Sequence, residues 1–511
     1  MTFMVMKPLS ATGRSTSRVA FTLGLAGLLG AACTAANGPP AVRAERPGAP
    51  TEVVRDRAQP APPFTFSPEE EKLLDEVQRG AFNFLWNAAD PATGMVVDRS
   101  SAAIVSVAGV GFQLSAIPIG VERGWVTRDE GEARAKLILS SLKLNPTNRK
   151  SGLFYHYLDG KTASATVDGY EHIVSTIDSA LLFAGMITAS SFFGGEVAQL
   201  ADSMVDAADW SAFVSGPEAR PSERGFVSLG WKPDDQNDTT GSGSLLPFYW
   251  VDSGDEHRLV TFLAVAASNP EYRVSAETYY RLRRRLGTHA DLGPIVWFPW
   301  SGALFTSFFA HCWIDYAAMD ADDPAKFGVE HRARVDWWEN SRRTAAMHRL
   351  KAIDNPKGLT GLGADVWGIN ASDAAHGYAV PGLFPMPLDM PQARPEFDFA
   401  THTPSDNWGD GTIAPYSAGC SIMFDPKAAM AALHRYRTIK GLWSDPSTGG
   451  YGFRDAFNLG TGWVAPDYVA IDQGPLILAI ENARTGLVWR LFHEHPVVRA
   501  GVERLKMQHG R

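Results

Sequence analysis

The sequence predicts an all-α fold in which two nested rings of helices close into an (α/α)6 barrel. Three observations favour this fold class. Apolar residues recur at helical spacing in about a dozen segments, apolar and polar residues almost nowhere alternate over a long stretch, and no obvious boundary divides the chain after residue 66. Such a double ring would gather its connecting loops at the ends of the barrel, where residues that bind ligands usually lie.

The predicted elements follow in order along the chain. A first helix begins after Ser67, because Ser67-Pro-Glu-Glu-Glu71 combines an N-cap serine, a proline in the first turn and acids that complement the helix dipole. Residues 151–158, 225–231 and 449–453 are compatible with short strands. The same helical periodicity predicts further helices over residues 104–122, 127–143, 171–193, 197–213, 254–268, 275–287, 302–319, 327–352, 425–437 and 470–484.

Two of the connecting loops are unusually long. Residues 214–250 and 353–424 are rich in Gly, Asp and Pro and show no sustained helical periodicity. A loop of this length inside a compact domain usually carries function. We therefore expect these loops on the active face of the barrel.

Residues 1–33 have the pattern of a signal peptide. A basic start is followed by a short apolar run over residues 19–29, and small residues precede Cys33. A lipoprotein signal would make a lipidated Cys33 the mature N-terminus and anchor the protein to a membrane, whereas ordinary cleavage near Ala35 would release it. Both outcomes predict an exported protein, either in the periplasm or held as an outer-membrane lipoprotein.

The rest of the chain divides into a linker and one domain. Residues 34–66 are rich in Ala, Pro, Gly and Arg, which predicts a disordered tether. Residues 67–511 are long enough to bury a large core, in a chain with 45% hydrophobic residues. We expect this domain to be a monomer.

Composition limits the class of ligand. The net charge of −9 argues against a nucleic-acid partner, which would need a basic stripe. The 15 Trp and 13 Tyr suit stacking on sugar rings, although most of them are expected in the core. Cys312 and Cys420 could pair in an exported chain, but the apolar surroundings of Cys312 are typical of a buried thiol. The sequence shows no CxxC or HExxH zinc signature.

Acidic residues embedded in apolar or glycine-rich segments are the most informative feature for function. Asp178, Glu256, Asp315 and Asp472 lie in such segments. Burying an unpaired carboxylate is costly, so these acids need internal partners or a cleft where polar groups meet a ligand. Carboxylates among aromatic residues are what a site for sugar cleavage requires.

Glu171 and Asp178 would share one face of the predicted helix 171–193 with Ser175. An N-terminal acid that complements the helix dipole accounts for Glu171. It accounts poorly for Asp178, which would lie two turns into that helix. This residue is therefore the stronger candidate for lining a site.

Glu256 would lie in the first turn of the predicted helix 254–268, at the rim of the barrel. Aromatic neighbours would raise its pKa, which suits a general acid. The rival interpretation is a capping box in which Glu256 reaches back to Ser253.

Other polar residues could line a subsite. His311 and Asp315 are four residues apart on one predicted helical face and could form an ion pair, bind a sugar hydroxyl or ligate a metal, although two ligands alone are a weak metal signal. Exposure on a helix could explain Asn340 and Arg343. A turn built on Asp-Gly accounts for Asp410 as well as a binding role does.

Several motifs between about residues 82 and 492 resemble the bacterial glucoamylase-like family, which includes the endo-β-1,2-glucanases of glycoside hydrolase family 144. They occur in order and without large gaps. The motifs are Asn340-Ser341 with His348-Arg349, Trp367-Gly-Ile-Asn-Ala-Ser-Asp373, Asp410-Gly-Thr-Ile-Ala-Pro415, Gly452-Phe-Arg-Asp-Ala-Phe-Asn458, Ile471-Asp-Gln-Gly-Pro475, Glu481-Asn482 and Thr485-Gly-Leu-Val-Trp489. Asp178, Glu256 and the pair His311 and Asp315 match acids and a His-x-Trp-x-Asp motif of the family.

The resemblance implies an (α/α)6 barrel that hydrolyses β-1,2-glucan to sophorose-type oligosaccharides with inversion, and it implies no metal or cofactor. In such a reaction Glu256 would be the acid, and Asp178, with Asp472 behind it, would be the base. The implied substrate-binding residues include the sugar-stacking candidates Tyr170, Trp313, Trp367 and Tyr378, together with the polar residues Glu171, His311, Asp315, Asn340, Arg343, Asp373 and Asp410.

Two alternatives remain at the level of the sequence. One is a hydrolase or transglycosylase that acts on cyclic or other β-glucans. The other is a lipoprotein that binds glucan without cleaving it. A binding protein needs aromatic residues but no pair of acids in opposed environments, so the environments of the acids discriminate between these readings.

Overall fold

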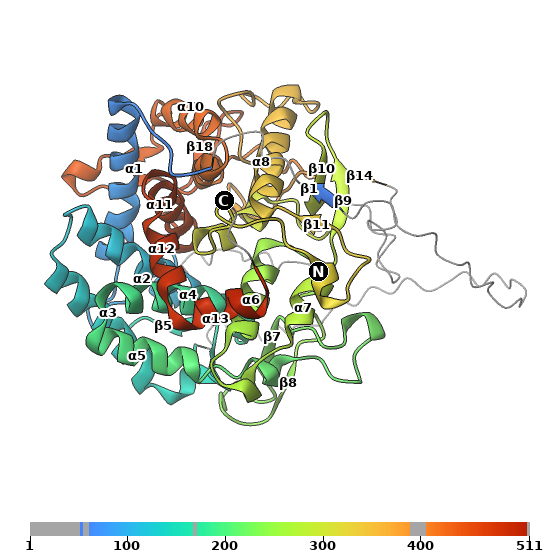
Figure 1. Cartoon of the computed structure of the whole chain (residues 1–511). Coiled ribbons are helices and arrows are strands. Elements are labelled where there is room, and N and C mark those ends of the chain that lie inside the picture. Colours follow the sequence, from blue (N-terminus) through green and yellow to red (C-terminus); the bar gives the residue numbers. More distant parts are fainter. Residues whose placement is uncertain (1–51, 55–60, 167–170, 389–404, 508–511) are drawn as a thin grey trace, which may run out of the picture.

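A computed structural model of the chain describes residues 52–54, 61–166, 171–388 and 405–507. The described part is mostly helical, with short strands between the helices (Figure 1). The helices are α1 (Pro68–Asn87), α2 (Val107–Glu122), α3 (Arg128–Leu144), α4 (Thr176–Phe193), α5 (Gly195–Asp206), α6 (Asp255–Ala266), α7 (Ala276–Arg281), α8 (Trp337–Asp354), α9 (Pro415–Cys420), α10 (Pro426–Arg437), α11 (Ala470–Arg484), α12 (Leu487–Glu494) and α13 (Pro496–Arg504).

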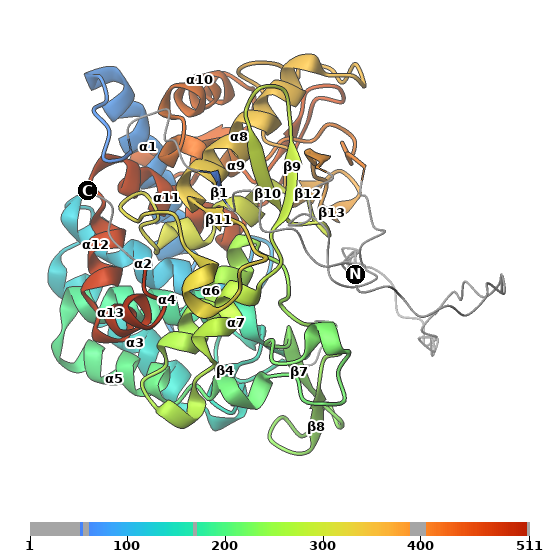
Figure 2. The same ribbon diagram turned by 45° about the vertical axis from the view of Figure 1, so that its right-hand side comes forward.

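The strands form small separate sheets of two or three strands, and the described part of the chain is mostly helical, as expected. Two sheets have three strands, and Figure 2 shows their β7–β8 and β9–β10 hairpins on the side of the molecule away from α1, α3 and α5. The three-stranded sheets are β6 (Val174–Ser175), β7 (Gly230–Pro233) and β8 (Gly243–Leu245), and β10 (Pro294–Trp297), β9 (Arg285–Thr288) and β14 (Met386–Pro387). The pairs are β1 (Glu52–Val54) with β11 (Arg334–Val335), β2 (Ile104–Ser106) with β5 (Tyr157–Asp159), β3 (Arg149–Lys150) with β4 (Leu153–Phe154), β12 (Ser372–Ala374) with β13 (Gly377–Ala379), β15 (Trp443–Ser444) with β16 (Gly452–Phe453) and β17 (Phe457–Asn458) with β18 (Trp463–Val464).

The core is built around four helices that are buried on nearly all sides, α2, α4, α6 and α11. A helix that is apolar around its whole circumference must lie inside a large protein or a membrane. Among the described residues only α4 is long and apolar enough to cross a membrane by composition, and 78% of that stretch is buried in the core. Helices α1, α5 and α13 bury one face each and keep a polar face outward.

Helices α2 and α4 approach each other closely through two glycines. A β-carbon on Gly111 would lie 2.2 Å from the Leu181 carbonyl oxygen, and one on Gly185 would lie 2.0 Å from the Gly111 carbonyl oxygen. Only residues without a side chain fit this contact. The contact fixes α4, whose first turn carries Asp178.

Most predicted helices are confirmed, with shifts at their ends. The helix expected over 302–319 is wrong, because this segment forms the short 3₁₀ turns Leu304–Ser307 and Ala310–Cys312. Side chains of other elements hold its backbone: Asn370 Oδ1 accepts from the Phe305 N–H at 3.0 Å, and Asp255 Oδ2 accepts from the Ala310 N–H at 3.0 Å. The segment expected as helix 275–287 is helical only in α7 and continues into β9.

Other boundaries also differ. Helix α8 begins at Trp337, ten residues later than the predicted 327, because Asp336 is its N-cap and accepts from the Glu339 N–H. The expected strands are confirmed in part by β4, β5, β7 and β16. Helices α9, α12 and α13 were not predicted.

The predicted linker 34–66 is partly ordered, which corrects the expectation for its last residues. Residues 52–54 form β1, which pairs in parallel with β11. The Phe64 N–H donates to the Ala483 carbonyl at 2.8 Å, and Phe66 is buried in the core. Residues 1–33, including Cys33, lie outside the described residues.

Candidate active site

Asp178 lies in the first turn of α4. The helix begins at Thr176 with Ser175 as its N-cap, so Asp178 is not two turns into the helix as expected, and Glu171 precedes the helix. Ser175 Oγ accepts from the Asp178 N–H at 3.3 Å and donates to Asp178 Oδ2 at 2.5 Å. These two hydrogen bonds fix the orientation of the carboxylate at the helix N-terminus, where the helix dipole favours its ionised form.

Glu256 is the second residue of α6, and its side chain keeps partial access to solvent. The expected rival, a capping box with Ser253, does not form, because the N-cap is Gly254 and Ser253 Oγ donates to the Arg283 carbonyl at 2.8 Å. Burial raises the pKa of Glu256 to about 8, and the negative charges of Asp178 and Asp255 contribute to this rise. A carboxyl group with such a pKa is protonated at neutral pH and can act as an acid.

One buried tryptophan ties the first turn of α4 to the segment that leads into α6. Trp250 Nε1 donates to Thr176 Oγ1 at 2.8 Å, and the Trp250 ring lies 4.6 Å from the ring of His257. Thr176 Oγ1 in turn donates to the Ser228 carbonyl at 2.8 Å. Through these contacts the fold positions Asp178 relative to Glu256.

His156 lies between two carboxylates. Its Nδ1 is 2.9 Å from Glu171 Oε2 and its Nε2 is 3.4 Å from Asp178 Oδ1. Burial alone would lower the pKa of His156, but the charges of Asp178, Glu171 and Asp98 outweigh burial and raise it to about 9. His156 is therefore a cation at neutral pH.

Arg99 is the second cation among these acids. Its Nη1 lies 2.9 Å from Asp373 Oδ1, and its Nε lies 3.6 Å from Asp98 Oδ2. The backbone around Arg99 is joined to the start of α11, since the Ala470 N–H donates to the Asp98 carbonyl at 2.8 Å. Arg99 thus connects the acids near α4 with those near α11.

Asp472 lies in the first turn of α11 and is fully buried. The Asp455 carboxyl and the Tyr416 hydroxyl face it, although neither carboxylate oxygen of Asp472 makes a well-aligned hydrogen bond with the described residues. Burial raises the pKa of Asp472 well above its usual range, and the neighbouring Asp455 raises it further. Burial also raises the pKa of Asp455, to about 6, so this pair of carboxyls favours holding a proton at neutral pH.

The hairpin β12–β13 brings two further predicted residues to these acids. Asp373 and Tyr378 are opposite each other in its register. The Asp373 N–H donates to Asp455 Oδ2 at 2.7 Å. Burial raises the pKa of the Tyr378 hydroxyl well above its usual range, with contributions from Asp472, Asp455 and Asp373. The long loop 353–424 was expected to be functional, and this hairpin is one described part of it that lies at the acids.

The structure thus gathers six of the predicted site residues around Arg99 and His156. These six are Glu171, Asp178, Glu256, Asp373, Tyr378 and Asp472. Tyr170 lies outside the described residues. Among the described residues, no group of three His, Cys, Asp or Glu side chains is arranged to hold a metal ion.

Three predicted site residues in the segment 311–315 stabilise the fold instead of lining the site. His311 is fully buried and its Nε2 lies 2.9 Å from Ser341 Oγ and 3.9 Å from Asp255 Oδ2, so it does not pair with Asp315. Asp315 Oδ1 accepts from the Ala318 N–H at 3.0 Å in a turn. Trp313 is fully buried, and its Nε1 donates to Ser115 Oγ at 2.9 Å. The expectation of one helical face failed because this segment is not an α-helix.

Four more predicted residues also have structural partners. Trp367 is buried, so it offers no face to a sugar. Asn340 exchanges hydrogen bonds with the Val296 backbone, and Arg343 binds Glu339 and the Pro294 carbonyl. Asp410 is exposed and accepts from the Thr412 N–H at 3.0 Å, which is the turn considered as the alternative.

Sequence reasoning missed Asp98, Arg99, His156 and Asp455 as site residues. Asp455 lies within the motif Gly452–Asn458, which was noticed without assigning the acid a role. The other three lie in short segments without helical periodicity. The pairing of two charged residues, Asp98-Arg99, at the end of an apolar run was the one available signal.

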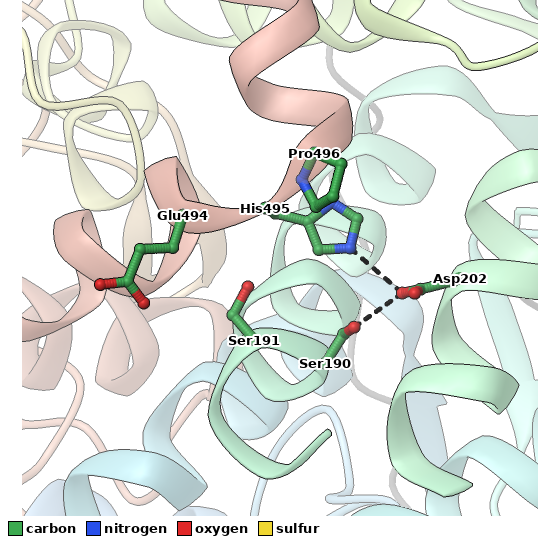
Figure 3. A pocket seen from close by; sticks show the side chains of 6 residues that line it. All are labelled: Ser190, Ser191, Asp202, Glu494, His495 and Pro496. Atoms are coloured by element: carbon green, nitrogen blue, oxygen red, sulfur yellow. Dashed lines mark hydrogen bonds and ion pairs between the residues drawn. The ribbon is translucent and has the colours of Figure 1, made fainter. Parts of the chain in front are cut away.

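A separate hollow lies near the opposite end of α4, lined by residues that include Ser190, Asp202 and His495. Figure 3 shows Ser190 and His495 pointing toward Asp202. Ser190 Oγ donates to Asp202 Oδ1 at 2.7 Å, and His495 Nε2 lies 3.1 Å from the same oxygen. The Val497 N–H donates to His495 Nδ1 at 3.3 Å, so this histidine has a role in capping α13.

Residues 248–496 match the family model Glycoamylase, described as putative glucoamylase. This part of the chain is therefore similar to domains of the glycoamylase family. The matched residues contain Glu256, Asp373, Asp455 and Asp472, whereas Asp178 and His156 precede them.

The chain is also similar to proteins along most of its length. It is 28% identical over 482 residues to an exo-β-1,2-glucooligosaccharide sophorohydrolase of Parabacteroides distasonis, in an alignment that covers 86% of this chain and 59% of that relative. The chain therefore spans little more than half of the length of this relative.

Solved structures share the fold of most of this chain. A putative glucoamylase from Bacteroides uniformis superposes with a TM-score of 0.71 at 27% identity, covering 87% of this chain and 99% of that one. A β-1,2-glucanase from Parabacteroides distasonis gives a TM-score of 0.70 at 26% identity, covering 86% and 61%. An endo-β-1,2-glucanase from Chitinophaga pinensis, with sophorotriose and glucose bound, gives 0.69 at 24% identity, covers 87% and 99%, and shows the likeness of fold alone.

Proposed function

We propose that this protein is a glycoside hydrolase that cleaves β-1,2-glucan to sophorose-type oligosaccharides by an inverting acid/base mechanism. The observation that carries the proposal is the pair Glu256 and Asp178, one carboxyl with its pKa raised to about 8 and one carboxylate held by Ser175 and His156. Two acids in opposed environments are what an acid and a base need. The names of the sophorohydrolase and the β-1,2-glucanase relatives support this substrate.

In this mechanism Glu256 donates its proton to the glycosidic oxygen as the bond from that oxygen to the anomeric carbon breaks. A water molecule attacks the anomeric carbon from the opposite face, and a carboxylate takes up one of its protons. Inverting enzymes hold the two carboxyls roughly 6.5–9.5 Å apart to leave room for this water. Asp178 is our first choice as base, because the hydroxyl of Ser175 and the cation of His156 both contact its carboxylate and orient it.

Asp472 is the second choice as base. Its burial favours the protonated form, which is the reverse of what a resting base needs. A cationic or polar group of the substrate environment would have to stabilise its charge. Glu171, Asp373 and Tyr378 are proposed to contact sugar hydroxyls around these acids.

The architecture proposed for the domain is the (α/α)6 barrel. The fully buried helices α2, α4 and α11 would belong to the inner ring, and the amphipathic helices α1, α5 and α13 to the outer ring. The three candidate catalytic acids lie in the first turns of α4, α6 and α11. The site therefore lies where the N-terminal ends of these helices meet.

Export is proposed from the signal-like residues 1–33. If Cys33 is lipidated, Cys33→Ala will move the protein from the membrane fraction to the soluble periplasmic fraction, as followed by immunoblot. Unchanged fractionation of this variant would favour cleavage near Ala35 and a released protein.

The test of the proposed activity is incubation of the purified protein with linear β-1,2-glucan, with the products separated by chromatography. A ladder of short oligosaccharides would establish endo cleavage, and a single disaccharide would establish exo cleavage. If neither this glucan nor other linear β-glucans are cleaved, the proposal is wrong, and cyclic glucans or binding without cleavage become the leading alternatives.

A further inference from the structure

His156 is held rigidly at the point where two carboxylates meet. Its backbone N–H donates to the Ile173 carbonyl at 2.9 Å, and its carbonyl accepts from the Val107 N–H at 3.0 Å. Its ring stacks on the ring of Tyr157 at a centroid distance of 3.9 Å. The imidazole therefore has little freedom to turn away from Glu171 and Asp178.

The contacts of the ring favour its charged form. A neutral imidazole has one N–H donor, whereas here Nδ1 lies 2.9 Å from Glu171 Oε2 and Nε2 lies 3.4 Å from Asp178 Oδ1. Only the imidazolium presents a proton to both carboxylates. The other Asp178 oxygen accepts from Ser175 Oγ, so both oxygens of Asp178 face donors.

The charges that face His156 come from three segments of the chain. Asp178 comes from the start of α4, Glu171 from the loop before β6, and Asp98 from the segment joined to the start of α11. Glu171 is about half exposed, whereas Asp178 is nearly buried. The three acids thus run from the outer rim of the site to its interior, with the cation between them.

We propose that His156 is a positioning residue of the site. Its imidazolium holds the Asp178 carboxylate ionised and oriented beside Glu256. Glu171 at the rim fixes the orientation of the imidazolium. This inference rests on the proposed function, in which Asp178 is the base. His156 itself takes no proton from the substrate. Its loss changes the pH at which Asp178 becomes a carboxylate.

The first test compares the pH dependence of kcat/KM for His156→Gln and the wild-type protein on β-1,2-glucan. Removing an opposite charge in contact with a carboxylate raises the pKa of that carboxylate by about 1 unit or more. The acid limb of the profile is therefore expected to move to higher pH by about 1 unit, with KM changed less than kcat. A merely structural role would lower the rate at every pH without moving the limb, and that result would overturn the inference.

The matched control is His495→Gln, which also removes a histidine in contact with a carboxylate, Asp202, at the hollow drawn in Figure 3. Ser190, which binds the same carboxylate, lies twelve residues after Asp178 on α4, and this places the hollow roughly 18 Å away along the helix. His495→Gln should leave the acid limb where it is. A second variant, Glu171→Gln, keeps His156 but removes its rim partner and should move the limb in the same direction by less.

A direct measurement needs no substrate. Ring-labelled histidine in the full chain is titrated by NMR, and the resonance of His156 is the one that His156→Gln lacks. The resonance should titrate at a pH of about 9. Titration below about pH 6.5, the ordinary range of histidine, would overturn the inference. If the wild-type protein leaves β-1,2-glucan intact, the proposed function fails, and this titration still decides whether His156 is a cation.

Discussion

The charge of Asp178 in α4 raises the pKa of Glu256 in α6, and the two residues occupy the first turns of helices that pack against each other. Both acids lie at helix N-termini, where the helix dipole favours a carboxylate. Burial outweighs this effect at Glu256, whereas Asp178 has Ser175 and His156 as partners. One charged and one neutral carboxyl therefore lie in one site at neutral pH.

The pH profile of turnover should reflect the protonation of Glu256. The protonated form of Glu256 is the active one in the proposed mechanism. As the pH rises toward the pKa of Glu256, kcat/KM should therefore stay constant, and it should fall above a pH of about 8. The measurement is kcat/KM on β-1,2-glucan from pH 4 to 10, in buffers of matched ionic strength. A basic limb near pH 5 would show that Glu256 has an ordinary pKa in the protein, contrary to this account.

Asp472 should destabilise the protein at high pH. The pKa of Asp472 in the folded state is raised above 3.8. As far as this group is concerned, the folded protein therefore has its full stability below pH 3.8 and loses stability as the pH rises through the folded pKa of Asp472. Asp472→Asn is neutral at every pH. As the pH is raised from 5 to 8, the melting temperature of Asp472→Asn should rise relative to that of the wild type. Calorimetry measures both melting temperatures.

The control for this prediction is Asp410→Asn, because Asp410 is exposed in a turn that an asparagine can also form. This variant should show no pH-dependent gain. Equal shifts of melting temperature at pH 5 and pH 8 for Asp472→Asn would mean that Asp472 is already ionised in the folded protein at pH 5, so that its pKa is not raised by burial.

Trp313→Phe should affect stability rather than substrate binding. The indole is fully buried, and the substitution leaves Ser115 Oγ without its donor and opens space beside Phe112. The expected loss is about 1–3 kcal/mol of unfolding free energy, measured by denaturant titration. KM for glucan should stay within about twofold. A large rise in KM at unchanged stability would show that Trp313 binds the sugar, contrary to this prediction.

The local sequence pattern predicted the boundaries of those helices in which the spacing of apolar residues and the capping residues indicate the same ends. Helix α1 begins after its predicted N-cap Ser67, and α3 and α10 begin and end within one residue of expectation. Residues 302–319 failed because Asn370 and Asp255, distant in sequence, take the backbone N–H groups that an α-helix would have used. Propensity yields to such tertiary contacts.

The site was predictable where one residue alone contradicted its surroundings. Asp178, Glu256 and Asp472 were found because each is an acid inside an apolar segment. His156 and Arg99 were missed because their role depends on acids that come from other segments, namely Glu171 and Asp373. His311 and Trp313 were assigned to the site because a polar or aromatic residue in an apolar segment has the same pattern whether it binds a ligand or packs in the core.

The most direct test of this account is the turnover of Glu256→Gln on β-1,2-glucan. The matched control is Glu277→Gln, which changes a more exposed glutamate in the first turn of α7. The account predicts that Glu256→Gln loses at least about a hundredfold in kcat, the usual scale for a general acid, while it still binds glucan oligosaccharides in calorimetry and Glu277→Gln stays active. Turnover of Glu256→Gln within a few-fold of the wild type would remove Glu256 from the mechanism and contradict the central claim.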